Sequence, residues 1–258
     1  MAEPQPNVAF AWTQASAGVG PALECRPLAA VARHLFTAHH LALRGNPAEW
    51  QAVAAALGAD SSVIRLVSQV HRDGVAVARG QDAEWNPPEA DIILTDDPDL
   101  VIAVRIADCA PVLIADPRRR AVGAVHAGWR GTVQSAARAG VCAMTREFGS
   151  DPRDLVAAIG PCLGVCCGEV GEEVVEAFRQ ARHPGDAIER WFSIGPAARF
   201  HLHLARANRD QLVAAGLRPD NIHVAGLCTR SYPEVFHSYR AAGANAGRMA
   251  AVIRAGGN

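Results

Sequence analysis

Short apolar runs separated by polar turns dominate the middle of the chain, a pattern typical of β-strands in a packed core. These runs predict strands over residues 92–95, 100–106, 111–115 and 121–126. The alternating segment SSVIRLVSQVH predicts a further strand over 62–71, with His71 on the same face as Val63. Because proline has no N–H to donate, Pro111 is expected at a strand start or at a sheet edge.

Helical periodicity replaces this pattern after residue 131. An apolar stripe over residues 133–148 predicts a helix with Thr132 as its N-cap and Gly149 at its end. Helices are also predicted over 172–182, before Pro184, and over 204–215, closed by a C-terminal glycine at 216. Strands over 155–159, 221–227 and 247–255 complete the predicted elements.

The order of these elements indicates the fold class. Several β-runs follow one another without intervening helices, which argues against a simple doubly wound parallel sheet. We expect a mixed α/β (α+β) fold, with a mixed β-sheet core and helices outside, as a single domain over residues 1–258. Residues 1–30 show the weakest pattern and are expected to form an extension that packs on the body.

Composition narrows the classes of protein that fit. Of the 258 residues, 50% are hydrophobic and 20% are charged, as in a packed globular protein. The net charge of −1 offers no basic excess for nucleic-acid phosphates. No apolar run reaches the roughly 20 residues of a membrane span, and no secretory leader is recognisable. We expect a cytoplasmic protein without nucleic-acid or membrane partners, either a monomer or a small homo-oligomer.

The seven cysteines do not form a pattern typical of secreted disulfide frameworks, because their number is odd and Cys166 and Cys167 are adjacent. Reduced thiols or metal ligands fit better. Cys162, Cys166 and Cys167 lie close together in the sequence, and we interpret them as packing residues of a loop ahead of a helix.

Three residues at predicted strand ends carry the candidate chemistry. His71 ends one strand, Cys109 follows another, and His126 ends a third, directly before a turn flanked by glycines. If the three ends converge, imidazole and thiolate ligands suit zinc, and three protein ligands leave a position open for water or substrate. The separations of 38 and 17 residues make spacing a weak signal.

Alternative interpretations remain open for each candidate. The two histidines fit hydrogen-bonded core positions, and Cys109 fits either a buried small hydrophobe or a nucleophile with His126 or His71 as its base. Arg130 fits a phosphate ligand beside a helix start, or a structural residue that binds loop carbonyls. Asp108 fits a group that orients a ligand or carries a proton, or a turn cap, and its charge predicts a raised pKa for a free Cys109 thiol.

Several motifs resemble one known family. The elements ADC at 107–109, HAGWRG at 126–131 and GRM at 247–249 occur in the order found in the YfiH-like family, also called the laccase-domain or peptidoglycan-editing-factor family. The resemblance covers the chain from about residue 35 and leaves residues 1–34 poorly matched. It implies that His71, Cys109 and His126 bind Zn²⁺ in an active site. Gly168 and Tyr232 depart from the family pattern at positions where they are expected to alter the substrate pocket. The matching stretches are 69–71, 90–117, 124–132, 159–174 and 225–253.

The resemblance also implies an activity. Members are described as purine nucleoside phosphorylases, in which phosphate attacks C1′ of adenosine, inosine or guanosine and releases the base with ribose 1-phosphate. Action on methylthioadenosine is also implied. Deamination of adenosine is a second implied activity, and it suits an open zinc site that activates water.

Two other enzyme classes remain. The family's older name suggests a copper-dependent polyphenol oxidase, but only one His-X-His pair is present, at 201–203, and Cys109 has no histidine neighbour. Cu²⁺ at a His₂Cys site is therefore a secondary expectation. The name peptidoglycan editing factor suggests an amidase that uses Cys109 as nucleophile on peptidoglycan precursors.

Overall fold

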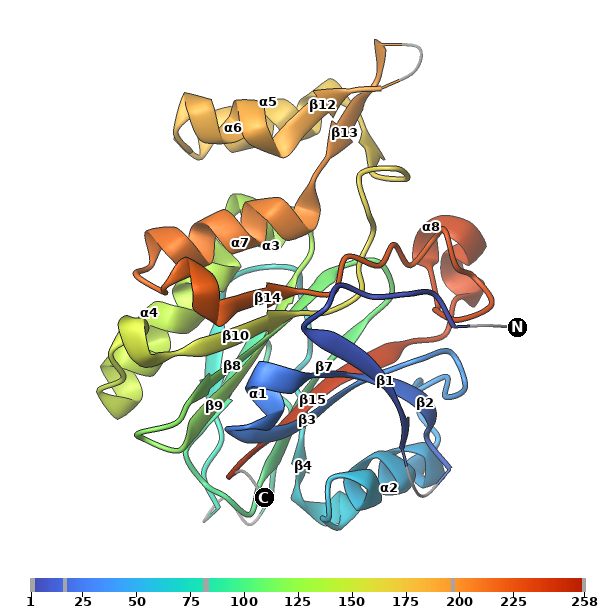
Figure 1. Cartoon of the computed structure of the whole chain (residues 1–258), viewed down its shortest axis with the longest axis vertical. Helices are drawn as coiled ribbons and strands as arrows, with labels where there is room; N and C mark the ends of the chain where they lie inside the picture. The colour runs from blue at the N-terminus through green and yellow to red at the C-terminus, as the bar shows by residue number, and fades with distance from the viewer. Residues whose placement is uncertain (1–2, 16–17, 81–83, 196–197, 257–258) are drawn as a thin grey trace.

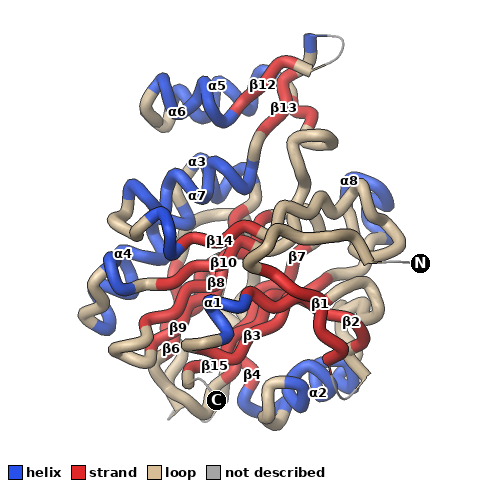
Figure 2. The backbone as a smooth tube through the Cα atoms, viewed as in Figure 1, coloured by secondary structure: helices blue, strands red, loops and turns tan. Residues whose placement is uncertain are grey.

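Two six-stranded β-sheets lie face to face, with helices on the outer surface of each (Figures 1 and 2). This computed structural model describes residues 3–15, 18–80, 84–195 and 198–256. In the first sheet, neighbouring strands are antiparallel, except that β4 runs parallel to β7. Its strand order is β1 (Phe10–Ala15), β2 (Gly20–Cys25), β3 (Ala32–Thr37), β15 (Met249–Ala255), β7 (Val101–Ile106) and β4 (Ile64–Arg65).

The second sheet forms the middle of the molecule. Its strand order is β14 (Ile222–Val224), β10 (Val156–Ile159), β8 (Ala110–Asp116), β9 (Ala121–Ala127), β6 (Ile92–Thr95) and β5 (Val75–Val77). The outermost pairs, β14 with β10 and β5 with β6, are parallel, and the inner pairs are antiparallel. Every residue of β8 and β9 is buried, since this sheet is covered on both faces. That double burial explains why these strands are almost uniformly apolar.

Three apolar layers hold the sheets and helices together. Between the sheets, Phe36 and Ile102 of the first belong to one cluster with Leu113 and Ala124 of the second. Outside the second sheet, α4 and α7 pack on its other face, and outside the first sheet α2 does the same. The helices of these layers are α2 (Pro47–Ala56), α3 (Trp129–Val133), α4 (Ala136–Phe148) and α7 (Leu204–Ala214).

A smaller unit projects beyond α7 (Figure 1). It consists of the three-stranded sheet β11 (Glu169–Val170), β13 (Phe200–Leu202) and β12 (Phe192–Ile194) with α5 (Glu172–Gln180) and α6 (Gly185–Trp191). Phe178, Ile188 and Trp191 bury its apolar side against the helices of the main body. Two further short helices are α1 (Arg26–Ala29) and α8 (Tyr239–Ala242).

The predicted fold class is confirmed, with mixed sheets at the centre and helices outside, although two stacked sheets replace the single sheet that we expected. The predicted strands over 92–95, 100–106, 111–115 and 121–126 match β6 to β9 within one or two residues. Pro111 is the second residue of β8, at a strand start as expected. The weakly patterned segment 1–30, expected as an extension that packs on the body, instead contributes β1 and β2 to the edge of the first sheet.

The strand predicted over 62–71 is wrong for most of its length. Only Ile64–Arg65 pairs with β7. The chain then leaves the first sheet, and Ser68 forms a bridge with Glu89, shortly before β6 of the second sheet. Hydrophobic alternation records which side chains are buried, and it does not reveal that a segment crosses from one sheet to another.

The helix predicted after Thr132 is interrupted. Thr132 lies inside α3, whose N-cap is Gly128, and its hydroxyl donates to the Gly128 carbonyl at 2.9 Å. The chain breaks at Ser135, whose φ of 62° is left-handed, before α4 begins at Ala136. Thr132 is therefore not an N-cap, whereas Gly149 ends α4 as predicted, with φ of 68°.

The described part of the chain contains no helix with both the length and the apolar character needed to cross a bilayer.

Candidate active site

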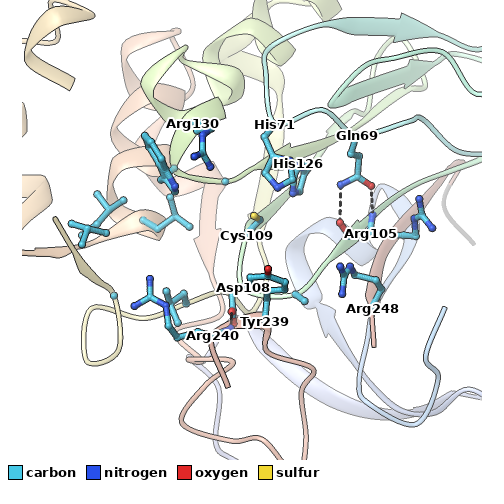
Figure 3. Close-up of a pocket in the computed structure, with 18 of the residues that line it drawn as sticks. Gln69, His71, Arg105, Asp108, Cys109, His126, Arg130, Tyr239, Arg240 and Arg248 are labelled. Atoms are coloured by element: carbon cyan, nitrogen blue, oxygen red, sulfur yellow. Dashed lines mark hydrogen bonds between the residues drawn. The ribbon is translucent and has the colours of Figure 1, made fainter. Parts of the chain in front are cut away.

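His71, Cys109 and His126 converge, as the family resemblance implied (Figure 3). One ligand atom from each lies within 4.8 Å of those of the other two. Cys109 lies between β7 and β8, His126 is the second-last residue of β9, and His71 lies in the loop between β4 and β5. The two imidazole rings have centroids 4.8 Å apart and planes at 81°. The sequence order alone could not show this convergence, because it depends on how both sheets stack.

Asp91, which the sequence analysis missed, organises two of the three residues. Its carboxylate is fully buried and accepts hydrogen bonds from the backbone N–H groups of Val70, His71 and Arg72, at 3.1, 2.9 and 2.7 Å. It also accepts one from His126 Nδ1, at 2.7 Å. The sequence offered one signal, because Asp91 stands directly before an apolar strand. An aspartate is almost never fully buried unless it has partners, so an acidic residue next to a buried strand indicates a hydrogen-bonded role.

This carboxylate determines two features of the site. His71 has a left-handed backbone with φ of 62°, a conformation that costs energy for a residue with a Cβ and is held here by the hydrogen bonds to Asp91. Because His126 Nδ1 donates to Asp91, Nε2 of the same ring is left to face the thiol.

Gly128 makes the close approach of the three groups possible. A Cβ at this position would lie 2.8 Å from Cys109 Sγ and 3.3 Å from His71 Cδ2. Any side chain there would displace the thiol or the imidazole, so the HAGWRG segment needs glycine next to the site.

Asp108 faces the neighbouring loops with its carboxylate. Its Oδ1 accepts from Thr229 Oγ1 and its Oδ2 from the Arg240 backbone N–H, both at 2.6 Å. The carbonyl of Asp108 accepts from the Leu163 backbone N–H at 2.8 Å. The residue has φ of 86°, so these bonds stabilise a strained turn that carries Cys109.

The thiol and the two imidazoles are strongly coupled in charge. Burial alone would raise the pKa of the Cys109 thiol, but the charges of and hydrogen bonds from His126 and His71 outweigh it and lower the pKa to about 6. Burial would lower the pKa of His126, yet the Cys109 thiolate and the Asp91 carboxylate raise it to about 9. The raised thiol pKa that the charge of Asp108 predicted is wrong, because the histidines determine it.

The site opens into a cavity of about 1060 Å³. One part of its lining is apolar and consists of Trp129, Leu163, Val170, Leu202, Leu204 and Tyr239. Gly168 also lines the cavity, as the resemblance predicted, whereas Tyr232 is not part of the lining. The remaining lining is cationic and includes Arg44, Arg105, Arg130, Arg240 and Arg248, with Asp108 as its one carboxylate.

Arg130 lies on the second residue of α3 and lines the cavity. Its guanidinium stacks 4.3 Å above the ring centroid of Trp129. Among the described residues it makes no ion pair and no hydrogen bond to a loop carbonyl. The guanidinium is therefore exposed and available to an anion.

Arg105 and Arg248 form a second cationic feature that the sequence analysis missed. Arg105 is on β7, and Arg248 directly precedes the neighbouring strand β15. Burial and then the nearby charge of Arg248 lower the pKa of Arg105. No carboxylate of the described chain pairs with either side chain, so the two positive charges repel each other. Figure 3 shows both beside Gln69, which exchanges two hydrogen bonds of 2.8 Å with the Arg105 backbone.

The three converging side chains fit a metal ion. Two imidazoles and one thiolate are the ligand types that zinc and copper prefer. Ions such as Mg²⁺, which prefer carbonyl and carboxylate oxygens, are disfavoured. A carboxylate behind a ligating histidine, as Asp91 lies behind His126, is the usual support of such a site. His71 is exposed and Cys109 half-buried, so the site is accessible from the cavity.

Comparison with known protein sequences gives clear matches. The profile of a family described as multi-copper polyphenol oxidoreductase laccase matches residues 47–256. A purine nucleoside phosphorylase of Bacteroides thetaiotaomicron is 37% identical over 161 residues, with 62% of this chain aligned to 58% of that protein. The match thus spans less than two thirds of that relative. The adenosine deaminase RL5, from an unknown prokaryotic organism, is 38% identical over 204 residues, which are 76% of each protein.

A solved structure shares the whole fold. The crystal structure of the hypothetical protein YfiH from Bacillus licheniformis aligns with a TM-score of 0.85 and 27% sequence identity. The alignment covers 95% of this chain and 98% of that chain. It therefore extends into the N-terminal strands, which lie before the residues that the family profile matches.

Replacing Asp91 with Asn should weaken the binding of a metal ion at this site. The amide keeps the volume, but its NH₂ group cannot accept from His126 or from the 70–72 backbone, so the ligands lose their orientation. We expect zinc affinity to fall roughly 10- to 100-fold, the usual effect of losing such a partner. Competition with a chromophoric chelator measures it. Asp73→Asn, on the same loop but exposed, is the matched control, and equal affinities for the two variants would refute the role of Asp91.

The low pKa of Cys109 should be visible in alkylation of the metal-free protein. Only the thiolate reacts, so the rate of iodoacetamide labelling should fall as the pH drops through about 6 and stay level above it. Peptide mass spectrometry resolves Cys109 from the other cysteines. His126→Ala should move this midpoint upward, and bound zinc should slow labelling. A wild-type midpoint near the ordinary cysteine value of about 8.5 would contradict the coupling.

Proposed function

Because this chain belongs to the multi-copper polyphenol oxidoreductase laccase family, the YfiH-like laccase-domain proteins, we propose that it is a zinc-dependent purine nucleoside phosphorylase. The observation that carries the proposal is the position of the His71, Cys109 and His126 set at a cavity that is apolar on one part and rich in arginine on the other. A purine base suits the apolar part, and phosphate suits the arginines.

The two parts of the cavity suit the two substrates of the proposed reaction. Phosphate attacks C1′ of adenosine, inosine or guanosine, the bond to the base breaks, and ribose 1-phosphate forms. Methylthioadenosine would react in the same way and give methylthioribose 1-phosphate. The guanidinium groups neutralise the phosphate and hold it against the sugar. Without this positioning, the two solutes would have to meet in the correct orientation by chance. Trp129 and Tyr239 offer aromatic faces in the lining that suit packing against a purine.

His71, Cys109 and His126 would hold the zinc ion. When bound, zinc would supply Lewis-acid polarisation and water activation in this cavity. Asp91 keeps the proton of His126 on Nδ1, so that Nε2 remains a ligand. Both carboxylate oxygens of Asp108 already accept hydrogen bonds, and we assign it a positioning role for the Cys109 turn rather than a proton-transfer role.

Deamination of adenosine is proposed as a side activity of the same site. The relative named adenosine deaminase, at 38% identity, supports it. Water takes the place of phosphate in this reaction and attacks C6 of the purine, releasing ammonia. The purine would then have to place C6, rather than C1′, near the three ligands.

One observation favours a second candidate, the Cys109-dependent amidase. Asp91, His126 and Cys109 form a hydrogen-bonded series, and the pKa of the thiol is lowered to about 6, as in an activated nucleophile. A catalytic triad of Cys109, His126 and Asp91 would not need His71. The position of His71 beside the same thiol therefore favours the metal site. Rapid alkylation of zinc-loaded protein at Cys109, with proportional loss of activity, would favour the amidase.

Product analysis tests the proposed function directly. Zinc-loaded protein incubated with adenosine should release adenine and ribose 1-phosphate only when phosphate is present, and some inosine without it. Chromatography of the nucleosides and bases measures both. Cys109→Ser should lose both products together with the zinc ion held by His71, Cys109 and His126, while Cys142→Ser, an exposed cysteine on α4, should lose neither. Adenine release that does not depend on phosphate would refute phosphorolysis.

Variants of the arginines should locate the phosphate. Losing one charged hydrogen bond to phosphate costs about 1.5–3 kcal/mol, so Arg105→Gln should raise the KM for phosphate roughly 10- to 100-fold and change the KM for adenosine far less. Arg130→Ala is expected to act in the same direction through its exposed guanidinium.

The control is Arg146→Gln, an exposed arginine on α4 outside the cavity, which should leave both constants unchanged. An equal loss of phosphorolysis and deamination in the Arg130 or Arg105 variant would indicate a structural residue, because deamination uses no phosphate.

A further inference from the structure

A second group of three thiols lies outside the candidate active site. The Sγ atoms of Cys166, Cys167 and Cys228 are all within 4.8 Å of one another. The first two lie in the loop between β10 and β11, and Cys228 follows β14. Backbone pairing brings the loops together, because Cys162 and Cys228 form a parallel bridge, with hydrogen bonds of 3.2 Å from Cys162 N–H to Leu227 O and 3.0 Å from Thr229 N–H to Cys162 O.

The backbone leaves space for the thiols to meet. A Cβ at Gly164 would lie 2.9 Å from Cys228 Cβ and 3.3 Å from the Sγ atoms of both Cys166 and Cys228. The loop can therefore close over the thiols only with glycine at this position. Cys228 is buried, Cys167 half-buried and Cys166 exposed, so the cluster is reachable from solvent on one side.

Polar groups lie beside two of the three sulfurs. The Ser231 hydroxyl lies 3.4 Å from Cys166 Sγ and 3.6 Å from Cys167 Sγ, and Arg230 Nη1 donates to Cys167 Sγ at 3.7 Å. A thiolate is the form of cysteine that binds metals.

The packing interpretation of the sequence fits only the fourth cysteine of this region. Cys162 is buried, and burial raises the pKa of its thiol well above the ordinary range, as for a protonated, small apolar side chain. Cys166, in contrast, exposes its thiol and turns it toward two other sulfurs and a hydroxyl. Core packing does not account for that arrangement.

We propose that Cys166, Cys167 and Cys228 form a second metal site, which binds Zn²⁺ through three thiolates. Sulfur ligands select thiophilic ions such as zinc, and the mutual separations allow one ion to contact all three atoms. The guanidinium of Arg230 offsets the excess negative charge of three thiolates on a divalent ion.

Bound metal would hold part of the cavity lining in place. Arg240, which lines the cavity, donates to the carbonyls of Cys167 and Glu169 at 3.1 and 2.9 Å, and Gly168 between them also lines it. A metal that joins this loop to Cys228 would fix the wall without touching the substrate. The site does not depend on the reaction proposed above, so each can fail alone.

Cobalt titration of the reduced, metal-free Cys109→Ser protein tests the site. Without Cys109, thiolate-to-cobalt charge-transfer absorption can arise only from other cysteines. We expect this absorption to saturate at one Co²⁺ per chain and to disappear when Zn²⁺ is added. Adding Cys142→Ser, which removes an exposed cysteine elsewhere, should change nothing.

Adding Cys166→Ser or Cys228→Ser should abolish the saturating absorption. Because Cys228 is buried, its variant is checked by circular dichroism, and the exposed Cys166 variant gives the same test without a risk to folding. Absence of the absorption in the Cys109→Ser protein, or its persistence in both cluster variants, would overturn the proposal. An intact mass lower by two hydrogens before reduction, with no cobalt binding after it, would instead indicate a disulfide.

Discussion

The buried carboxylate of Asp91 is the interaction on which the candidate site depends. One side chain accepts hydrogen bonds from the backbone of the His71 loop and from the ring of His126, two segments that are 55 residues apart. A buried carboxylate without partners would be costly, so folding of the second sheet and closure of the His71 loop are coupled through it. The ligands are thereby oriented before any metal binds, which reduces the cost of assembling the site.

The stacking of two sheets explains why the cavity has two different walls. The second sheet supplies Cys109 and His126 near the ends of β8 and β9. The first sheet supplies Arg105 and Arg248 near the ends of the paired strands β7 and β15. Two of the candidate metal ligands thus come from one sheet, and the Arg105–Arg248 pair comes from the other.

Strand bounds were predicted most accurately for strands that are buried on both faces. Strands β8 and β9 are covered on both faces, so their sequences are continuously apolar and their bounds could be predicted within one or two residues. The segment 62–71 has equally regular alternation but crosses between sheets, and the break at Ser135 depends on a left-handed backbone that its residue type does not require. Local pattern determines burial, whereas sheet membership depends on contacts distant in sequence.

The sequence by itself determined the residue types of the site and the family resemblance of their motifs, and so it identified His71, Cys109 and His126. It also offered Arg130 as a candidate phosphate ligand and Gly168 as a pocket position, and both residues line the cavity. Only the tertiary structure decided that Asp91 supports two ligands, that Arg105 and Arg248 face the same space, and that Cys228 joins Cys166 and Cys167. Those relations join segments 20 to 143 residues apart, and no local periodicity records which distant segments meet when two sheets stack.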